Sequence, residues 1–216
     1  ESLVMIQCVG CRNEDRNYCS RICCSESIKN SLRLKEINPE MDVYILFRDV
    51  RTYGFSEDYY REAADKDVKF IRYEPQAEPE VTVGESEEGR PVLKVTAPDY
   101  ILGKKVEIDA DIVALAAAII PSAGSKEVSR LFKVTLGPDG FFQEAHVKLR
   151  PVEFAADGVY LCGTAHYPKL MREAIEQAYG AAGQVLTLLS HDTVTASGSV
   201  CEVDEKKCIG CEACIS

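Results

Sequence analysis

Three short runs of apolar residues stand in the first third of the chain, at 3–9, 43–47 and 68–73. Continuous apolar runs of this length are typical of strands that are covered on both faces of a parallel sheet. Parallel strands need a crossover between them, and the crossover is usually a helix. We therefore predict helices in the two intervals between the runs.

Both intervals carry helical patterns. In the first, Cys24, Ile28 and Leu32 recur every four residues, which predicts a helix over about 20–37. In the second, residues 57–66 place aromatic residues and alanine on one face. The resulting order β-α-β-α-β is typical of a doubly wound α/β half-domain.

The pattern changes over residues 80–110. Apolar and polar residues alternate there in three short segments, 81–83, 92–96 and 105–108. Turns rich in Gly and Glu separate these segments. This alternation predicts an antiparallel meander. Residues 111–116 return to a continuous apolar run and predict another buried strand.

The remaining part of the chain predicts a strand at 158–162 and a long helix at about 169–189, followed by a polar linker. We divide the chain into three parts. Residues 1–110 form the half-domain with its meander, residues 111–190 form a second unit, and residues 191–216 hold the linker and a short C-terminal module.

Charge and apolar content limit the possible functions. The net charge is −10, and a protein that binds nucleic acid needs clustered Lys and Arg, so we expect no nucleic-acid partner. The longest apolar run, 112–121, is shorter than the roughly 20 residues that cross a bilayer, so we expect no direct membrane insertion. The chain begins without Met and stops inside a cysteine motif, and we interpret it as a fragment.

Five of the ten cysteines form a first group with the spacing C-x2-C-x7-C-x3-C-C, directly after the first predicted strand. They stand where a dinucleotide-binding half-domain would have a glycine-rich turn. A secreted disulfide framework would spread its cysteines along the chain, whereas here a long stretch has none. We expect a ligand cluster in a reducing cytoplasm. The group consists of Cys8, Cys11, Cys19, Cys23 and Cys24.

Thiolates that converge on one loop select zinc or an iron–sulfur cluster. The adjacent Cys23 and Cys24 favour a polynuclear cluster, because neighbouring residues point in different directions and can reach different iron atoms. Two alternatives stay open at this point. One is a single zinc ion, and the other is buried structural cysteine with a redox-active Cys8/Cys11 pair.

A second group, Cys208, Cys211 and Cys214, matches the first three positions of the bacterial ferredoxin run C-x2-C-x2-C-x3-C-P. The fourth cysteine would fall two residues after Ser216. We therefore predict the start of a ferredoxin-type module whose cluster this chain does not complete. Cys201 is out of register with the run, and we expect it to pack rather than to bind metal.

Several segments together make the chain similar to a known family, the A-type subunits of heterodisulfide reductase. Flavoproteins of the membrane complexes of sulfate reducers share the same features. The similarity covers about residues 4–216. It is carried by Met5-Ile-Gln-Cys-Val-Gly, Tyr18-Cys-Ser-Arg-Ile-Cys-Cys, Lys29, Gly140-Phe-Phe, Leu149-Arg-Pro-Val and Asp157-Gly-Val-Tyr-Leu-Cys-Gly.

The resemblance implies a cytoplasmic oxidoreductase subunit of anaerobic metabolism, with FAD on a thioredoxin-reductase-like fold, an embedded [4Fe-4S] cluster and added ferredoxin domains. Its partners would be the heterodisulfide reductase B-like and C-like subunits, with hydrogenase or dehydrogenase electron donors, and flavin-based bifurcation is frequent in the family. The full-length subunit would be a homodimer. The alternative is a zinc- or thiol-stabilised scaffold that binds partner subunits without carrying electrons.

The resemblance also implies site residues. The embedded cluster maps onto Cys8, Cys19, Cys23 and Cys24. Cys11 stands where relatives commonly have Ser, which leaves open whether Cys8 or Cys11 is the fourth ligand. Lys29 matches a family lysine near flavin N5, where a cation stabilises the anionic reduced flavin; without the resemblance it would be an ordinary solvated helix lysine.

The closing FAD segment of the family matches residues 163–171, and the small-residue crossover near the flavin matches Ala116-Ala-Ala118. The glycine-rich half that binds the ADP part of FAD is absent from this sequence, so we expect a partial FAD site only. The expected flavin-facing residues are Ala117, Gly163, Thr164, Ala165, Pro168, Lys169 and Leu170.

Overall fold

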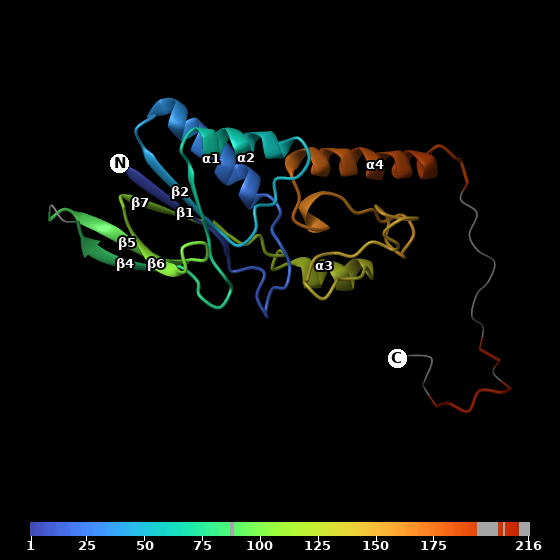
Figure 1. Ribbon diagram of the computed structural model, residues 1–216. Helices are drawn as coiled ribbons and strands as arrows, with labels where there is room; N and C mark the ends of the chain where they lie inside the picture. The colour runs from blue at the N-terminus through green and yellow to red at the C-terminus, as the bar shows by residue number, and fades with distance from the viewer. Residues whose placement is uncertain (87–88, 194–202, 205, 212–216) are drawn as a thin grey trace.

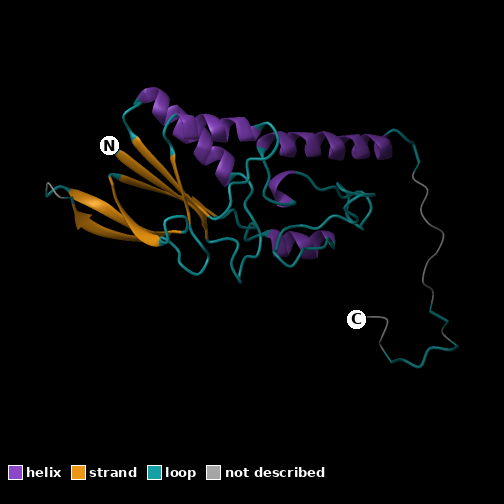
Figure 2. Cartoon of the chain, in the orientation of Figure 1, coloured by secondary structure: helices purple, strands orange, loops and turns teal. Residues whose placement is uncertain are grey.

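A computed structural model describes residues 1–86, 89–193, 203–204 and 206–211. A parallel sheet with two helices on one face and a small second sheet on the other forms one end of the molecule (Figure 1). A part that has no strand among its described residues, and that carries two further helices, forms the other end (Figure 2). The chain enters this second part where the last strand of the parallel sheet ends.

The main sheet has four parallel strands in the order β3-β2-β1-β7. Met5 of β1 lies opposite Ile45 of β2 on one side and Ala114 of β7 on the other. The predicted strand over 43–47 is therefore an interior strand, as a continuous apolar run requires. The strands are β1 (Ser2–Val9), β2 (Asp42–Phe47), β3 (Lys69–Arg72) and β7 (Ile112–Ala117).

Helices α1 (Cys23–Ile37) and α2 (Ser56–Asp65) cover one face of this sheet. Side chains that alternate along β1 and β2 pack against the apolar stripe of α1, because successive residues of a strand point to opposite faces. This confirms the predicted β-α-β-α-β order, although α1 begins at Cys23, three residues after the predicted start. The core between sheet and helices includes Leu3, Met5, Ile28, Leu32, Val43, Ile45 and Ala63.

The opposite face of the sheet packs against the predicted meander, which the structure confirms as an antiparallel three-stranded sheet in the order β4-β5-β6. Its strands are β4 (Glu80–Glu85), β5 (Pro91–Asp99) and β6 (Lys104–Ala110). Val4, Ile6 and Leu46 of the parallel sheet meet Val95, Ala97, Ile108 and Ala110 of the meander in a second core.

Three expectations for the second half of the chain need correction. The strand predicted over 111–116 exists as β7, but it lies at the sheet edge with Leu115 58% exposed, so it is not buried. The boundary predicted at residue 110 falls before β7, which joins the first sheet. Residues 158–162 form no strand, and a single bridge joins Tyr160 to Glu153.

Two helices shape the second part. Helix α3 (Ser125–Phe132) was not predicted, because eight residues are too few for the apolar period to show. Helix α4 (Met171–Leu189) confirms the predicted long helix and starts two residues later than expected. Of the small-residue face that was predicted for this helix, only Ala181 is buried. A short 3-10 turn, η1 (Gly163–Ala165), precedes α4.

The C-terminal module is only partly described. Cys208 and Cys211 are exposed and free, whereas Cys201 and Cys214 lie outside the described residues. The expectations for the linker and for the ferredoxin-type module therefore stay predictions. No helix within the described ranges has the length and apolar character that a membrane span needs.

Candidate functional site

The first cysteine group lies on the segment from Cys8 to Cys24, here called the cysteine loop, which connects the carboxyl end of β1 to the first turn of α1. Three residues of this loop have backbone φ angles in the left-handed region, Cys8 at 62°, Arg12 at 58° and Arg21 at 63°. Only two other non-glycine residues in the described chain do so. Such strain persists where surrounding structure enforces it, and it concentrates at functional sites.

The thiols of the loop are free and close enough to influence one another. A hydrogen bond from the Cys8 thiol lowers the pKa of Cys11 and raises that of Cys8. Burial raises the pKa of Cys23 to about 11, and the neighbouring thiols of Cys11, Cys24 and Cys19 add to this effect. All five cysteines of the loop are therefore one interacting group at the end of the sheet.

Several donors point at the sulfur atoms. The backbone N–H of Arg21 donates to Cys19 Sγ at 3.2 Å, and Arg12 Nη1 donates to Cys8 Sγ at 3.7 Å. Arg12 is itself held by Asp49, 2.5 Å away. Donors of this kind favour the charged thiolate over the thiol.

The donor set fits an iron–sulfur cluster or zinc in its chemistry, because it supplies soft sulfur ligands and hydrogen bonds for their negative charge. The cysteine side chains of the loop, however, are not arranged around one common metal position. In the ranges that the structure describes, no three His, Cys, Asp or Glu side chains are arranged so that they could hold a metal ion. The predicted ligands Cys8, Cys11, Cys19, Cys23 and Cys24 are thus brought to one loop, and their coordination stays a prediction.

The crossover after β7 is fastened to the cysteine loop. Tyr18 donates its hydroxyl hydrogen to the carbonyl of Ile119 at 2.9 Å, and the N–H of Ile119 donates to Ser20 Oγ at 2.9 Å. The predicted flavin-facing crossover at Ala117 is therefore tied, through the nearby Ile119, to the loop that carries the thiols. Sequence reasoning had placed these two segments in different units.

A second tie joins the cysteine loop to the start of α4. Arg21 Nη2 lies 2.6 Å from Glu173 Oε1, and the other oxygen of Glu173 accepts the N–H of Leu170 at 2.8 Å. Glu173 thus caps the helix and binds the loop at the same time. Because Arg21 and Glu173 lie 152 residues apart, no local sequence pattern predicted this contact.

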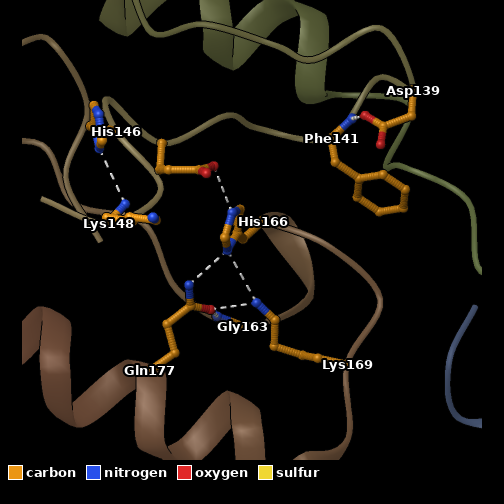
Figure 3. Close-up of polar contacts among 9 residues, drawn as sticks. Asp139, Phe141, His146, Lys148, Gly163, His166, Lys169 and Gln177 are labelled. Atoms are coloured by element: carbon orange, nitrogen blue, oxygen red, sulfur yellow. Dashed lines mark hydrogen bonds and ion pairs between the residues drawn. The ribbon is translucent and has the colours of Figure 1, made fainter. Parts of the chain in front are cut away.

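The turn before α4 is organised by Gln177 (Figure 3). Its Oε1 accepts hydrogen bonds from the Gly163 N–H at 3.0 Å and from Lys169 Nζ at 2.6 Å. Its amide nitrogen therefore faces His166 Nδ1, 2.7 Å away, and must donate to it. Three of the seven predicted flavin-facing positions, 163, 169 and 170, are held by side chains of α4.

This arrangement determines which ring nitrogen of His166 carries the hydrogen. Both Gln177 and Lys169 Nζ, which is 3.2 Å away, are donors toward Nδ1, so Nδ1 carries no hydrogen. The hydrogen is on Nε2, which donates to Glu144 Oε2 at 2.8 Å. Burial lowers the pKa of Lys169, and Arg21 nearby adds to this effect. Sequence reasoning noted His166 only as a departure from the family and missed Glu144 and Gln177.

Two cavities flank this turn. Thr164 and Ala165 line one of about 380 Å³, together with Ile119 of the crossover. Lys29 and Leu170 share another of about 630 Å³ between α1, α2 and the start of α4. The Lys29 side chain is 64% exposed and pairs with Glu26, so it faces the second cavity from the surface of α1. Lys29 thus lines a different cavity from the one that Thr164 and Ala165 line. Pro168 is fully buried beneath the turn.

Comparison with known proteins adds to this geometry. No family model matches the chain. It is 37% identical over 215 residues to a protein of Archaeoglobus profundus that is similar to the A-type subunit of heterodisulfide reductase, covering 99% of the chain and 30% of that protein. It is 38% identical over 216 residues to the iron-sulfur A-type subunit of CoB–CoM heterodisulfide reductase of Methanocaldococcus jannaschii, covering 98% of the chain and 32% of that protein.

The chain is homologous to a part of the A-type subunit of heterodisulfide reductase. It spans about a third of the length of these curated relatives. The cysteine loop, the crossover and the turn before α4 all fall within the shared region, since the alignments cover nearly every residue of the chain.

Solved structures identify the fold. Thioredoxin reductase of T. acidophilum superposes on 88% of the chain with a TM-score of 0.52 and 16% identity, covering 53% of that protein. Lactococcus lactis thioredoxin reductase gives a TM-score of 0.54 at 13% identity, with the same coverage of both chains. The expected thioredoxin-reductase-like α/β fold is confirmed, whereas the start of a ferredoxin module is not shown.

Proposed function

We propose that this chain carries electrons between FAD and a [4Fe-4S] cluster as part of an iron–sulfur flavoprotein subunit in a heterodisulfide-reductase-like complex. One observation carries the proposal. The Arg21–Glu173 ion pair and the Ser20 and Tyr18 hydrogen bonds fasten the cysteine loop to the segments expected to face the flavin. Electron transfer between two groups needs them held close together in a fixed arrangement.

Cys8, Cys19, Cys23 and Cys24 would hold the cluster, with Cys11 as the alternative to Cys8. Bound there, the cluster would supply one-electron transfer. The protein residues tune that site. The Arg21 N–H and the Arg12 guanidinium donate to cysteine sulfur atoms and thereby stabilise the negative charge that reduction adds.

Residues 111–190 would supply part of the flavin site. Gly163, Thr164 and Ala165 lead into the N-terminus of α4, whose free N–H groups favour an electron-rich ligand edge. Lys29 would supply a cation at the neighbouring cavity. Gln177 and His166 fix the turn in place, so that its backbone donors keep their direction.

The wider context of the chain is also part of the proposal. Relatives are named as subunits of reductase complexes, which supports B-like and C-like redox subunits as partners and hydrogenase or dehydrogenase donors. The proposal also includes flavin-based electron bifurcation, a cytoplasmic location and a homodimer of the full-length subunit. The cytoplasmic location is included because five free thiols in one loop suit a reducing compartment.

The competing proposal is a zinc- or thiol-stabilised scaffold. It has one observation in its favour, the hydrogen-bonded pair of Cys8 and Cys11, which resembles a dithiol rather than a ligand set. In that case the loop would stabilise the fold and would carry no electrons.

Low-temperature electron paramagnetic resonance separates the two. The chain is prepared without oxygen and reduced with dithionite. We expect the signal of a reduced cluster, its loss in Cys23→Ser, and its retention in Cys162→Ser, which alters an exposed cysteine outside both groups. A protein without a signal, or one whose signal survives Cys23→Ser, would contradict the proposal.

A further inference from the structure

A cavity of about 480 Å³ lies at the carboxyl end of the parallel sheet, between the cysteine loop and the residues that follow β2 and β3. Arg48, which directly follows β2, faces it, and so does Gln76 from the loop after β3. The cysteine loop contributes Arg12, Asn13 and Asn17. In open α/β sheets, ligands bind outside the carboxyl ends of the strands, and a volume of this size suits a small molecule. None of these residues is a cysteine or belongs to the turn before α4.

Within the described part of the chain, Arg48 has no partner for its charge. Its Nε atom is buried without a hydrogen-bond acceptor. Over the ranges that the structure describes, no carboxylate pairs with the Arg48 guanidinium, whereas Arg12 and Arg51 both pair with Asp49. A guanidinium is always charged at ordinary pH, and burying one of its N–H groups without an acceptor is unfavourable. The buried Nε is not itself open to the cavity, but Arg48 lines the cavity with a positive charge that no described carboxylate pairs, so the cavity suits an anion.

The charged residues of the lining differ in their exposure. Arg48 and Arg12 are half-buried, whereas the two acidic residues of the lining, Glu14 and Glu78, are exposed. Asn13 uses its Oδ1 to accept the Arg16 N–H at 2.8 Å, which leaves its NH₂ group free to donate. The half-buried part of the lining thus carries the two guanidinium groups, and the amide side chains of Asn13, Asn17 and Gln76 are exposed together with the two carboxylates.

We propose that this cavity binds a small molecule through a phosphate or carboxylate group, with Arg48 as its principal ligand. The planar guanidinium offers two parallel N–H donors that match the two oxygens of either group. Asn13, Asn17 and Gln76 are placed to donate to the remaining oxygens or to the body of the molecule. This binding function is distinct from electron transfer, although Arg12 lines the cavity and also donates to Cys8 Sγ.

Calorimetric titration of the full chain with inorganic pyrophosphate and, separately, with citrate tests the proposal at constant ionic strength. We expect saturable one-to-one binding of at least one anion, and the stronger of the two identifies phosphate or carboxylate as the group. Arg48→Gln should weaken binding by about tenfold or more, because the charged bidentate contact is lost. Arg48→Lys should bind with an intermediate affinity, since it keeps the charge and loses the fork.

Arg51→Gln is the matched control. Arg51 lies three residues away, is 45% exposed at its side chain, pairs with Asp49 and does not line the cavity. Its loss should change the affinity by no more than about twofold. Should Arg48→Gln unfold the protein, Arg48→Lys takes its place against the same control. The proposal is overturned if neither anion binds the unaltered chain, or if Arg48 and Arg51 variants lose equal affinity.

Discussion

At the scale of single residues, the chemistry of the cysteine loop depends on which sulfur atoms receive hydrogen bonds. Cys8 receives one from Arg12, and Cys19 receives one from the Arg21 backbone. Cys11 is only 3% exposed and is bonded to Cys8 and Ser20 instead. The proposal assigns Cys8 and Cys19 as cluster ligands, whereas the hydrogen bond from the Cys8 thiol lowers the pKa of Cys11 and favours a thiolate at Cys11.

We predict that Cys11→Ser retains the cluster, because a hydroxyl can take the place of the thiol in the hydrogen bonds with Cys8 and Ser20. Cys8→Ser should lose it, because a ligand is removed. Visible absorbance and iron content after anaerobic reconstitution measure both variants. A protein that loses its cluster in Cys11→Ser and keeps it in Cys8→Ser would reverse the assignment of the fourth ligand.

Glu144 predicts a pH dependence of stability. Burial opposes its ionisation, but its own backbone N–H and the His166 ring donate hydrogen bonds that lower its pKa overall. A carboxyl group with a lowered folded pKa stabilises the fold above its unfolded pKa of about 4.5 and loses this contribution as the pH falls through the folded value.

Glu144→Gln should therefore lower the free energy of unfolding at pH 7 by about 1 kcal/mol and reduce its decline on acidification. Urea titrations at several pH values measure this, with the exposed Glu176→Gln as the control. Equal pH profiles for Glu144→Gln and the unaltered chain would show that the contact with His166 contributes nothing.

At the scale of elements, the cysteine loop and α4 are coupled through Arg21 and Glu173, whose side chains are 33% and 26% exposed. We predict a coupling free energy of about 1 kcal/mol from a double-mutant cycle with Arg21→Ala and Glu173→Ala. The pair is more buried than an ordinary surface ion pair and carries the cap of α4, so it exceeds the surface value.

The control for this cycle is Arg33–Glu36 on α1, an exposed pair with 70% and 53% exposure. It should couple by no more than about 0.5 kcal/mol. The free energy of unfolding from denaturant titration is the measured quantity in both cycles. Equal coupling in the two pairs would mean that Arg21 does not hold the loop to the helix.

Strands could be predicted from the sequence where both of their faces lie in the same environment. The run at 43–47 gave the correct interior strand because both of its faces are buried. The same reasoning misjudged β7, because an apolar run does not distinguish an interior strand from an exposed edge. The apolar run at 158–162 belongs to a loop that packs Leu161 and Phe154 into a small core and has a single bridge in place of a strand.

Some features of the candidate site could likewise be predicted from the sequence, and others could not. The five cysteines could be found from sequence because they lie within seventeen residues and share one chemistry. The ties that surround them could not be found, since Arg21 meets Glu173 and Tyr18 meets Ile119 only after the chain has folded back. Their signal is long-range geometry, which a single sequence does not carry.

At the scale of the whole molecule, the proposal assigns to this chain only a part of an FAD site. The sequence has no G-x-G-x-x-G turn, where the pyrophosphate of a dinucleotide binds. The turn before α4 offers about two or three hydrogen bonds, each worth about 1 kcal/mol, against the roughly 8 kcal/mol of micromolar binding.

We therefore predict that the chain alone binds FAD more weakly than about 1 μM. Quenching of flavin fluorescence during titration measures this, with riboflavin as the control ligand that lacks the ADP part. Saturable one-to-one binding of FAD below about 1 μM would show that the affinity lies within these residues and that the proposed division of the flavin site is wrong.

The presence of an iron–sulfur cluster in the cysteine loop is the central claim, and metal analysis tests it most directly. Iron, acid-labile sulfide and zinc are measured in anaerobically prepared protein that carries Cys208→Ser and Cys211→Ser, so that the second cysteine group contributes nothing. The account predicts a brown protein with about four iron and four sulfide per chain and little zinc. A colourless protein with one zinc per chain and no sulfide would contradict it.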